Sequence, residues 1–293
     1  MKAAVYYENG SPDVLKYEDV PDPVCHPKGV IIRVLAVSIE GGDTLNRWRG
    51  PLVRVPHIVG YQASGEIVEV GSEVTHLKVG QKVATCDGFG SHAELRPVPA
   101  RNCWPIPDSL DPRHAAVIPV AFGTAHDCLF EFGRLKAGET VLVQAGASGV
   151  GLAAIQLAKA QGCEVIGTAG TEDGLALISA LGAKAVSHKK EGYIAEIKTL
   201  SPEGVDVILE MAAHINLGAD LPLLRRGGTV VVIGNKGMTE TNINPRALML
   251  TESQVVGLLG PGSPEESKEV LAGKRVREAR VCIIAISGSR CVL

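Results

Sequence analysis

Residues 140–162 read TVLVQAGASGVGLAAIQLAKAQG, and this stretch joins a strand, a glycine-rich turn and a helix in immediate succession. Val141, Leu142 and Val143 form a short apolar run that is typical of a buried strand. The turn is G-x-S-x-x-G, the dinucleotide-binding pattern with serine in place of its middle glycine. Small residues there allow a tight turn and let the backbone approach a pyrophosphate, while the helix amino end offers free N–H groups. Between a strand and a helix, this pattern predicts a phosphate-binding loop.

The chain after about residue 120 alternates between strand-like and helix-like segments around this loop. We expect further strands over residues 164–170, 183–188, 204–211, 227–234 and 254–260, with helices over 149–162, 172–182, 192–201, 216–226 and 245–253. The strands are continuous and rich in β-branched residues, as buried parallel strands are. Repeated strand–helix alternation with short links predicts an α/β fold with a doubly wound parallel sheet.

The first 120 residues have a different pattern. Apolar stretches at residues 1–7, 29–39, 65–71 and 81–86 are short, and glycines and prolines separate them at irregular spacing. This pattern is typical of a β-rich domain. We therefore divide the chain into a β-rich domain (1–120), a dinucleotide-binding domain (121–264) and an atypical, shortened tail (265–293), in which residues 281–286 are a candidate strand.

Composition excludes several classes of partner. The chain has 293 residues, a formal net charge of -3 and only 4% aromatic residues, which argues against nucleic acid or an anionic membrane as a partner. Its seven cysteines form no C-x-x-C pair, and no apolar leader or membrane-spanning run is evident. We expect a reduced, cytoplasmic protein whose partner is a small-molecule substrate.

Several longer stretches carry a family resemblance. They are GSPDVLKYEDVPDP, GEIVEVGSEVTHLKVGQKV, LKAGETVLVQAGASGVGLAAIQLAKAQG, VDVILEMAA and LLRRGGTVVVIGNKG, in that order. With them the chain resembles the medium-chain dehydrogenase/reductase superfamily from residue 1 to about 272, and within it the zinc-free quinone oxidoreductases, the zeta-crystallin group. The resemblance implies a GroES-like catalytic domain followed by a Rossmann domain, a cleft between them, NADPH as cofactor, and a homodimer or homotetramer. Because the tail departs from the family, a frameshift is one hypothesis for its origin.

The resemblance also bears on metal. Zinc-containing relatives carry a cysteine in the segment that matches residues 37–47, then a histidine and a glutamate at the positions of Tyr61 and Gln62. This chain has no thiol in that segment, and tyrosine is a poor zinc ligand. Its sequence between Cys86 and Cys103 also lacks the four closely spaced cysteines of the structural zinc lobe. We therefore predict no metal site, and we expect Tyr61 to line the nicotinamide side of the cleft.

Catalytic candidates lie in the same region. Related quinone reductases place an asparagine and a tyrosine near the nicotinamide, where this chain has Glu40 and Leu45. Glu40 is a candidate general acid if the cleft buries it, since burial favours the protonated carboxyl group. The alternative is an ordinary surface turn beside the two glycines that follow. Asp43 and Tyr61 complete the candidate catalytic set.

The resemblance gives the cofactor contacts residue by residue. They are Ala147, Ser148, Gly149, Val150, Gly170, Lys189, Tyr193, Asn235, Lys236 and Leu258. The second strand of the lobe ends without the acidic residue that NAD enzymes usually carry. Lys189 and Lys190 could contact a 2′-phosphate or form a solvated surface pair, and on balance NADPH is favoured over NADH.

These features predict an NADPH-dependent oxidoreductase that transfers hydride to a quinone or an activated alkene, such as an enal or enone, without zinc. Catalysis would depend mainly on orienting cofactor and substrate together. The alternative is an NADPH-binding protein with little turnover, in a crystallin-like structural or RNA-associated role. NADPH binding without turnover would favour this alternative.

Overall fold

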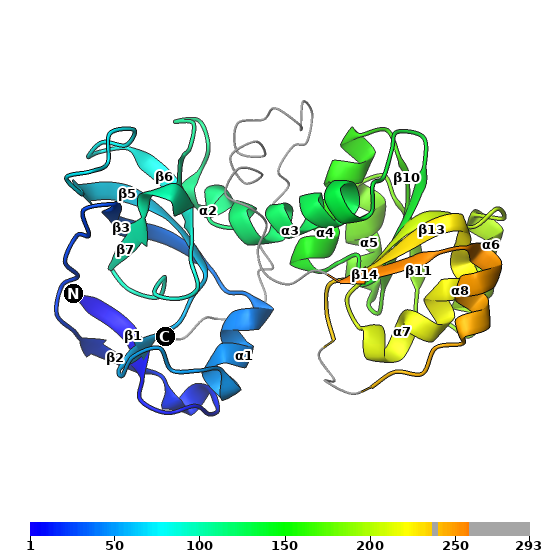
Figure 1. The fold of residues 1–293 in the computed structure, drawn as a ribbon, viewed down its shortest axis with the longest axis horizontal. Helices are drawn as coiled ribbons and strands as arrows, with labels where there is room; N and C mark the ends of the chain where they lie inside the picture. The colour runs from blue at the N-terminus through cyan, green and yellow to red at the C-terminus, as the bar shows by residue number, and fades with distance from the viewer. Residues whose placement is uncertain (236–239, 258–293) are drawn as a thin grey trace.

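A computed structural model describes residues 1–235 and 240–257, and these residues form two lobes that a long helical segment joins (Figure 1). The predictions for Lys236, Leu258, and residues 265–293 with their candidate strand at 281–286 lie outside the described residues. The two-lobe architecture confirms the expected β-rich first domain followed by a doubly wound parallel sheet.

The first lobe contains two antiparallel sheets. One has the strand order β7-β3-β5-β6-β8 and the other has the order β2-β1-β4. Their bounds are β1 Lys2–Tyr6, β2 Lys16–Asp19, β3 Gly29–Ser38, β4 His57–Ile58, β5 Gln62–Val70, β6 Lys82–Cys86, β7 Leu95–Pro99 and β8 Cys103–Pro105. Helix α1 (Gly41–Arg49) follows β3 directly, and the short 3-10 turns are η1 Pro12–Val14 and η2 Ala100–Asn102.

The second lobe is a six-stranded parallel sheet with the order β11-β10-β9-β12-β13-β14. Its strands are β9 Thr140–Val143, β10 Glu164–Ala169, β11 Lys184–Ser187, β12 Val205–Glu210, β13 Leu224–Val232 and β14 Gln254–Gly257. Its helices are α4 Gly149–Ala160, α5 Glu172–Ala180, α6 Tyr193–Leu200, α7 Ala213–Asp220 and α8 Pro245–Thr251. The chain reverses direction across the sheet at β9, which places the glycine-rich loop at the centre of the carboxyl edge.

Alternate side chains of the strands build two apolar cores. Val141 and Val143 of β9 point to the face that α4 and α5 cover, whereas Leu142 points to the face of α6, α7 and α8. All three side chains have no exposed surface. Since both faces of the sheet are covered, its strands are continuous apolar runs, as the sequence indicated.

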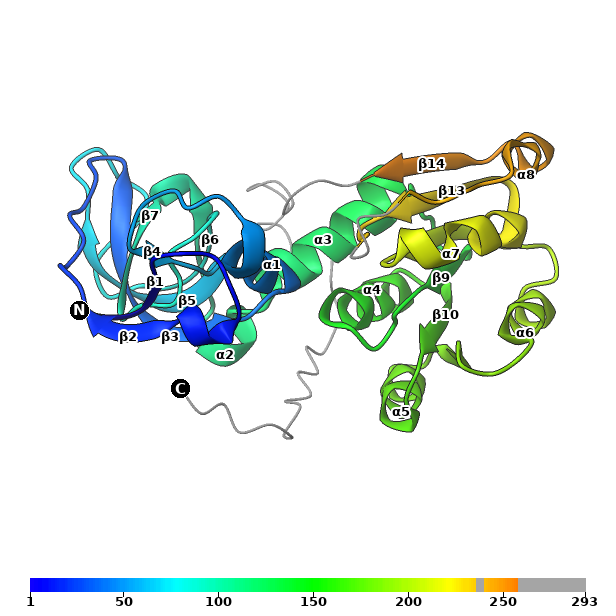
Figure 2. The same cartoon turned by 90° about the horizontal axis from the view of Figure 1, so that it is seen from below.

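A long helical segment connects the lobes and was not predicted from the sequence. It comprises α2 (Pro112–Ala115), the π-helical turn η3 (Ile118–Phe122), α3 (Gly123–His126) and the π-helical turn η4 (Asp127–Phe132). Figure 2 shows α3 running between the two lobes. Residue 120, the expected domain boundary, falls inside this segment.

The connecting segment is apolar on most of its circumference because both lobes pack against it. Over residues 112–132 it is long and apolar enough to span a bilayer, but 72% of its most apolar window is buried inside the protein. Within the described part of the chain, no other helix has that length and composition. A helix buried in this way is typical of a protein core.

One predicted helix is wrong at both ends. The sequence indicated a helix over residues 216–226, but α7 ends at Asp220, and β13 begins at Leu224 after a 3-10 turn, η5 (Leu221–Leu223). Pro222 lacks an N–H group and cannot continue the helical hydrogen bonds. Leu224 instead pairs with Val205 of β12 and extends the sheet.

Candidate functional site

The glycine-rich loop begins α4 with a free helix amino end. Ser148 is the N-cap residue, and its Oγ accepts a hydrogen bond of 3.1 Å from the backbone N–H of Gly151. Ser148 and Gly149 are exposed, and a Cβ added at Gly149 would meet no atom within 4 Å. The first N–H groups of the helix have no intrahelical partner, so this open end suits a phosphate group.

Other positions of the loop have no spare room. A Cβ added at Gly151 would lie 2.4 Å from the carbonyl oxygen of Ala145, so the helix can approach the strand only with glycine there. Ala145 itself has a φ of 51°, in the left-handed region. The backbone N–H of Gly146 donates to the carbonyl of Thr168 in β10 at 2.7 Å. Gly146 and Gly151 are tightly packed, whereas Gly149 faces open space. A loop that binds a pyrophosphate needs both features.

Lys189 lies beside Gly170 at the ends of β10 and β11, where the adenosine end of a dinucleotide would bind. A Cβ added at Gly170 would lie 3.2 Å from Cε of Lys189 and 2.7 Å from Nε2 of His188. Lys189 is exposed and has no ion pair within the described residues, whereas Lys190 pairs with Glu196 at 3.0 Å. Of the two lysines, Lys189 is therefore the one available to a 2′-phosphate.

His188 was missed by the sequence reasoning. Its ring contacts Gly170, and its backbone N–H donates to the carbonyl of Ala169 at 3.1 Å, so it lies at the same edge of the sheet. Its position after the third strand of the lobe, beside the two lysines, was the signal available in the sequence. His188 joins Gly170 and Lys189 as a candidate contact of the cofactor.

The remaining predicted cofactor contacts are less directly placed. Tyr193 is the first residue of α6 and packs, half-buried, against the apolar cluster on one face of the sheet. Burial raises the pKa of its phenol, and the charges of Asp220 and Glu210 raise it further. Asn235 is exposed just after β13, at the carboxyl edge of the sheet.

Glu40 lies at the junction of β3 and α1 rather than in a surface turn. Its Oε1 accepts hydrogen bonds from the hydroxyl of Ser38 at 2.7 Å and from Nε2 of Gln62 at 2.5 Å. Both hydrogen bonds are donated to the same carboxylate oxygen. The arrangement therefore suits Glu40 as a hydrogen-bond acceptor that orients Gln62 better than as a proton donor.

Asp43 is committed to the backbone around it. Its side chain is 2% exposed and accepts from the backbone N–H groups of Glu40 at 2.8 Å and of Tyr61 at 3.2 Å. Burial raises the pKa of Asp43, although these hydrogen bonds and the charge of Arg96 oppose the rise. Asp43 thus fastens the start of α1 to the chain that leads into β5.

Of the three predicted catalytic residues, Tyr61 is the one whose side chain, through its hydroxyl group, suits a proton donor. Its hydroxyl oxygen accepts a hydrogen bond of 3.0 Å from Nδ2 of Asn46, and within the described residues its own proton is donated to no acceptor. Burial raises the pKa of this phenol, and the bond from Asn46 opposes the rise. The ring rests on Gly42, where an added Cβ would lie 2.4 Å from a ring carbon.

Arg96 binds the backbone of Tyr61, and no pattern in the sequence predicted this role. This fully buried side chain donates to the carbonyl of Tyr61 at 2.7 Å, the carbonyl of Phe89 at 3.1 Å and the hydroxyl of Thr85 at 3.0 Å. Burial lowers the pKa of Arg96 to about 10. A buried guanidinium that binds carbonyl groups fixes the loop at residues 87–89 and the backbone of Tyr61 together.

The residues at the positions of zinc ligands in the zinc-containing relatives are engaged in other contacts. The side-chain oxygen of Gln62 accepts from the backbone N–H of Val120 at 2.9 Å, while its amide group donates to Glu40. Among residues 1–235 and 240–257, no group of three or more His, Cys, Asp or Glu side chains is arranged to hold a metal ion.

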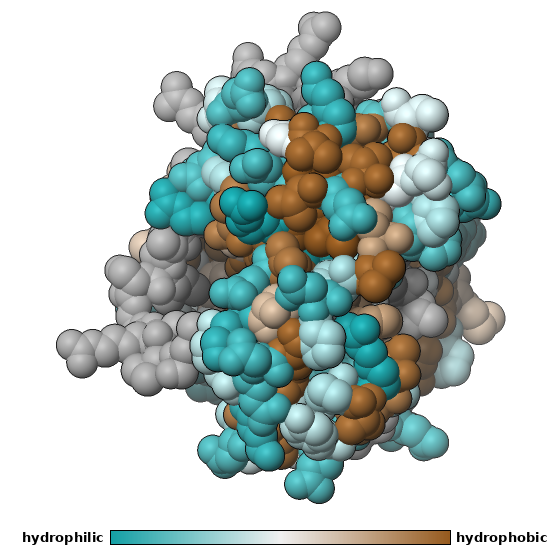
Figure 3. Space-filling view, turned by 90° about the vertical axis from the view of Figure 1, so that its left-hand side faces the viewer, coloured by the Kyte–Doolittle hydropathy of each residue, from teal (hydrophilic) through white to brown (hydrophobic). Residues whose placement is uncertain are grey.

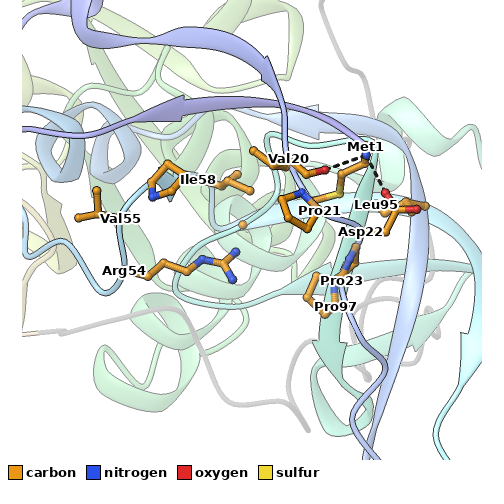
Figure 4. A pocket seen from close by; sticks show the side chains of 12 residues that line it. Met1, Val20, Pro21, Asp22, Pro23, Arg54, Val55, Ile58, Leu95 and Pro97 are labelled. Atoms are coloured by element: carbon orange, nitrogen blue, oxygen red, sulfur yellow. Dashed lines mark hydrogen bonds and ion pairs between the residues drawn. The ribbon is translucent and has the colours of Figure 1, made fainter.

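A cavity of about 270 Å³ lies elsewhere in the first lobe, and none of the predicted site residues lines it. The surface at the end of this lobe mixes apolar and hydrophilic patches (Figure 3). Arg54 extends into the cavity toward the segment at Pro21 and Pro23 (Figure 4), and its guanidinium also lies 5.6 Å from the ring centre of Phe89. Because the cavity does not adjoin the glycine-rich loop, we place the functional site at the loop and Tyr61.

Two family models match the chain. The model described as the alcohol dehydrogenase GroES-like domain matches residues 26–108, and the one described as zinc-binding dehydrogenase matches residues 149–273. The words zinc-binding belong to the description of the family. This chain lacks the histidine and the thiol of a zinc site at the corresponding positions.

Curated proteins and solved structures agree with the family models. The chain is 37% identical to human quinone oxidoreductase and 39% identical to the rat protein, in both cases over 93% of this chain and 84% of the relative. A quinone oxidoreductase of Pseudomonas syringae pv. tomato is 26% identical with a TM-score of 0.84, covering 94% of this chain and 86% of that chain. A mycobacterial protein solved in complex with NADPH is also 26% identical, with a TM-score of 0.83 and coverage of 94% and 87%.

Proposed function

The chain belongs to the medium-chain dehydrogenase/reductase superfamily, alongside the curated quinone oxidoreductases, and we propose that it is an NADPH-dependent oxidoreductase. Its acceptor in this proposal is a quinone or an activated alkene, and the reaction needs no metal ion. NADPH supplies the hydride when it is bound, while the protein binds both reactants and supplies a proton.

One observation carries the choice of cofactor. The glycine-rich loop offers an open helix amino end to a pyrophosphate, and the same edge of the sheet carries Lys189 and His188 around Gly170. A cationic side chain without a carboxylate partner suits the 2′-phosphate that distinguishes NADPH from NADH. The mycobacterial relative crystallised with NADPH supports the same assignment.

Tyr61 is our candidate for the group that assists the acceptor. Its hydroxyl has a proton to donate, and Asn46 stabilises the negative charge that develops on the oxygen as the proton leaves. Glu40 and Asp43 act behind it: Glu40 holds Gln62, and Asp43 holds the backbone N–H of Tyr61. Metal independence rests on the side chains at these positions, since neither phenol nor amide is a good zinc ligand.

The decisive test combines binding with transfer. NADPH is titrated against the protein by fluorescence, and its oxidation is then followed with ortho-quinones, para-quinones and α,β-unsaturated ketones. With an α,β-unsaturated ketone and NADPH deuterated at the reactive carbon, deuterium is expected on the β-carbon of the reduced product. Full activity after metal chelation supports metal independence. Failure of NADPH to bind would overturn the proposal, whereas tight binding without turnover on any acceptor would favour the non-enzymatic alternative.

We further propose that the protein is a homo-oligomer that associates through the edge strand β14. Among the described residues this strand pairs with β13 only, and Val255 on it and Met249 and Leu250 on α8 are exposed. An exposed strand edge with apolar neighbours is a template for pairing with a second copy. Analytical ultracentrifugation tests this, and a monomer at micromolar concentration would contradict it.

A reduced, cytoplasmic location remains part of the proposal. The five described cysteines are unpaired, and Cys86, Cys103, Cys128 and Cys163 are buried among apolar residues. Unpaired thiols are typical of a reducing compartment. The proposed partner is a small-molecule substrate, with neither nucleic acid nor a membrane; imaging of a fluorescently tagged protein tests the location.

A further inference from the structure

Four buried polar side chains lie beneath the glycine-rich loop, and the proposed reaction does not use them. Gln144 follows β9, Thr168 is in β10, Glu210 ends β12 and Asp220 ends α7. Their exposed fractions are 3%, 0%, 0% and 0%, so bulk solvent does not reach their side chains. Buried polar groups of this kind persist only when they form a connected network.

The hydrogen bonds of this network run in one direction. The backbone N–H of Ala145 donates to Oγ1 of Thr168 at 3.1 Å. The Thr168 hydroxyl donates to Oε1 of Gln144 at 2.8 Å, and Nε2 of Gln144 donates to Oδ1 of Asp220 at 2.8 Å. Each donor is already committed, so the orientation of the Gln144 amide depends on both of its partners.

The network ends in a pair of carboxyl groups. Oε1 of Glu210 accepts from the backbone N–H of Ala212 and from Nδ2 of Asn216, the latter at 3.3 Å. This leaves Oε2 of Glu210 and Oδ2 of Asp220 buried, with no donor from other groups in the described residues. A side-chain hydrogen bond between the two carboxyl groups is among the causes that raise the pKa of Asp220. Since two carboxylates have no proton between them, that bond requires one group to be protonated.

Burial and the neighbouring Glu210 raise the pKa of Asp220 to about 9, and the hydrogen bond from Gln144 opposes this rise only in part. Two negative charges in a buried site also repel each other, and this repulsion raises the pKa of Asp220 in the same way. The buried, unpartnered oxygens and the raised pKa of Asp220 are both accounted for if the pair holds one proton at neutral pH.

The opposite end of the network holds a strained part of the loop. Ala145 has a left-handed backbone conformation, which costs an L-residue about 1 kcal/mol or more. Its carbonyl oxygen accepts from the backbone N–H of Ser148 at 2.9 Å and lies against Gly151. The bond from Ala145 to Thr168 thus helps to hold the residue that sets the position of the phosphate cradle.

We propose that the carboxyl pair of Glu210 and Asp220 holds a single proton that controls the affinity of the glycine-rich loop for the dinucleotide pyrophosphate. Gln144 and Thr168 are positioning residues that connect the pair to Ala145. Loss of the proton places a second negative charge beneath an anionic ligand and breaks the bond between the two carboxyl groups. Both effects weaken dinucleotide binding. This inference rests on the proposed function, because it concerns the same cofactor site.

Other titratable groups near the pair belong to the helices on this face. Tyr193 on α6 is close enough for both carboxyl groups to raise its pKa, and His214 is the other titratable residue of α7. The other charged residues of the strands lie at the opposite, amino ends of those strands; they are Glu164, Lys184, Asp206, Arg225 and Arg226. The helices on this face also carry Glu196 and Lys198 on α6 and Arg246 on α8. A pH effect that passes through the pair must therefore be separated from the ionisation of Tyr193.

The test measures the dissociation constant of NADPH between pH 6 and 10 by fluorescence, in the wild-type protein and in Asp220→Asn. The wild-type affinity is expected to weaken roughly tenfold above pH 8, within the usual range of coupling between sites. Asparagine carries a permanent donor in place of the proton, so Asp220→Asn is expected to lose this pH dependence. Asp108→Asn, at an exposed position of the first lobe, is the control and is expected to keep the wild-type affinity and profile. Tyr193→Phe is compared only for the shape of its pH profile, because Tyr193 is itself a predicted cofactor contact.

Thr168→Val tests the connection to the loop. This variant is expected to weaken NADPH binding roughly tenfold at neutral pH, whereas Thr199→Val on the exposed face of α6 leaves the affinity unchanged. Identical pH profiles for wild type and Asp220→Asn would overturn the inference. If Asp220→Asn does not fold, Glu210→Gln takes its place, and a flat wild-type profile alone also overturns it. NADPH that binds without a pH effect removes only this inference, whereas no binding at all removes the proposed function.

Discussion

The backbone N–H of Val120 donates a hydrogen bond of 2.9 Å to the side-chain oxygen of Gln62, and this bond ties the connecting segment to β5 of the first lobe. The same amide donates to Glu40, so one fully buried side chain joins three parts of the chain. Gln62 is therefore a structural junction between these parts of the chain.

Replacing this junction is expected to destabilise the protein. Gln62→Leu leaves the N–H of Val120 without its partner and removes one of the two donors to Glu40, which costs about 2 kcal/mol or more. Chemical denaturation measures the free energy of unfolding. Gln161→Leu, at an exposed position after α4, is the matched control and is expected to change it by less than about 0.5 kcal/mol. Equal effects of the two substitutions would contradict the role of the junction.

Tyr61→Phe tests the proposed proton donor. Removing the hydroxyl is expected to lower kcat for acceptor reduction about a hundredfold, which is at the lower end for a general acid. Because Tyr61 lies away from the glycine-rich loop, the dissociation constant of NADPH serves as the internal control. Tyr7→Phe removes an exposed hydroxyl that bonds Glu18, and it provides a matched substitution. If Tyr61→Phe retains wild-type kcat, another group supplies the proton.

Two glycines of the loop are expected to respond differently to alanine. Gly149→Ala adds a methyl group to open space, so the fold is retained, but the methyl group projects where a phosphate would bind and weakens NADPH affinity. Gly151→Ala places the same group 2.4 Å from the carbonyl oxygen of Ala145 and lowers stability. Thermal melting and NADPH titration separate the two effects. A stable Gly151→Ala variant would show that the loop can relax.

Lys189→Gln is expected to reduce the preference for NADPH over NADH by about tenfold, the effect of losing roughly 1.4 kcal/mol of interaction with a 2′-phosphate. Lys190→Gln is the control, because the ammonium group of Lys190 already pairs with Glu196 at 3.0 Å. The ratio of the two dissociation constants is the measurement. An unchanged ratio in Lys189→Gln would transfer the role to His188 or to another residue.

The carboxyl pair also predicts how stability depends on pH. An unfolded aspartate loses its proton near pH 4, whereas Asp220 in the folded protein keeps it to about pH 9. Between these values the folded state binds the extra proton, so stability falls as pH rises through this window. Asp220→Asn is expected to flatten this dependence in chemical denaturation at pH 5, 7 and 9. A wild-type protein whose stability rises over the same range would contradict the assignment.

Local patterns in the sequence predicted the second lobe well. The glycine-rich loop, its strand and its helix are adjacent in the chain. The alternation of strand-like and helix-like segments predicted a sheet with helices on both faces. The connecting segment was missed because it is apolar on most sides and contains Pro119 and Gly123, which break a helical pattern. The end of α7 was misplaced because Leu224 pairs with a strand that lies 19 residues earlier in the chain.

Much of the candidate site depends on contacts between distant residues. Gln144 and Asp220 are 76 residues apart, and Gln62 and Val120 are 58 residues apart, so no local pattern indicates that they meet. Glu40 could be placed near the cleft by its neighbours, but only the two donors on its carboxylate show that it accepts hydrogen bonds. The roles of buried polar residues follow from the fold and not from spacing.

The connecting segment has a practical consequence for anyone who wishes to separate the two lobes. A cut at residue 120 would divide a continuous helix and expose Ala121, Phe122 and Ala125, which are at most 6% exposed in the intact protein. Phe122 and Ala125 belong to the same apolar cluster as Val141 of β9, so a second lobe that began at residue 121 would carry an exposed apolar surface and aggregate. Beginning that fragment at Asp111, the residue that caps α2, would keep this helix with the sheet on which it packs.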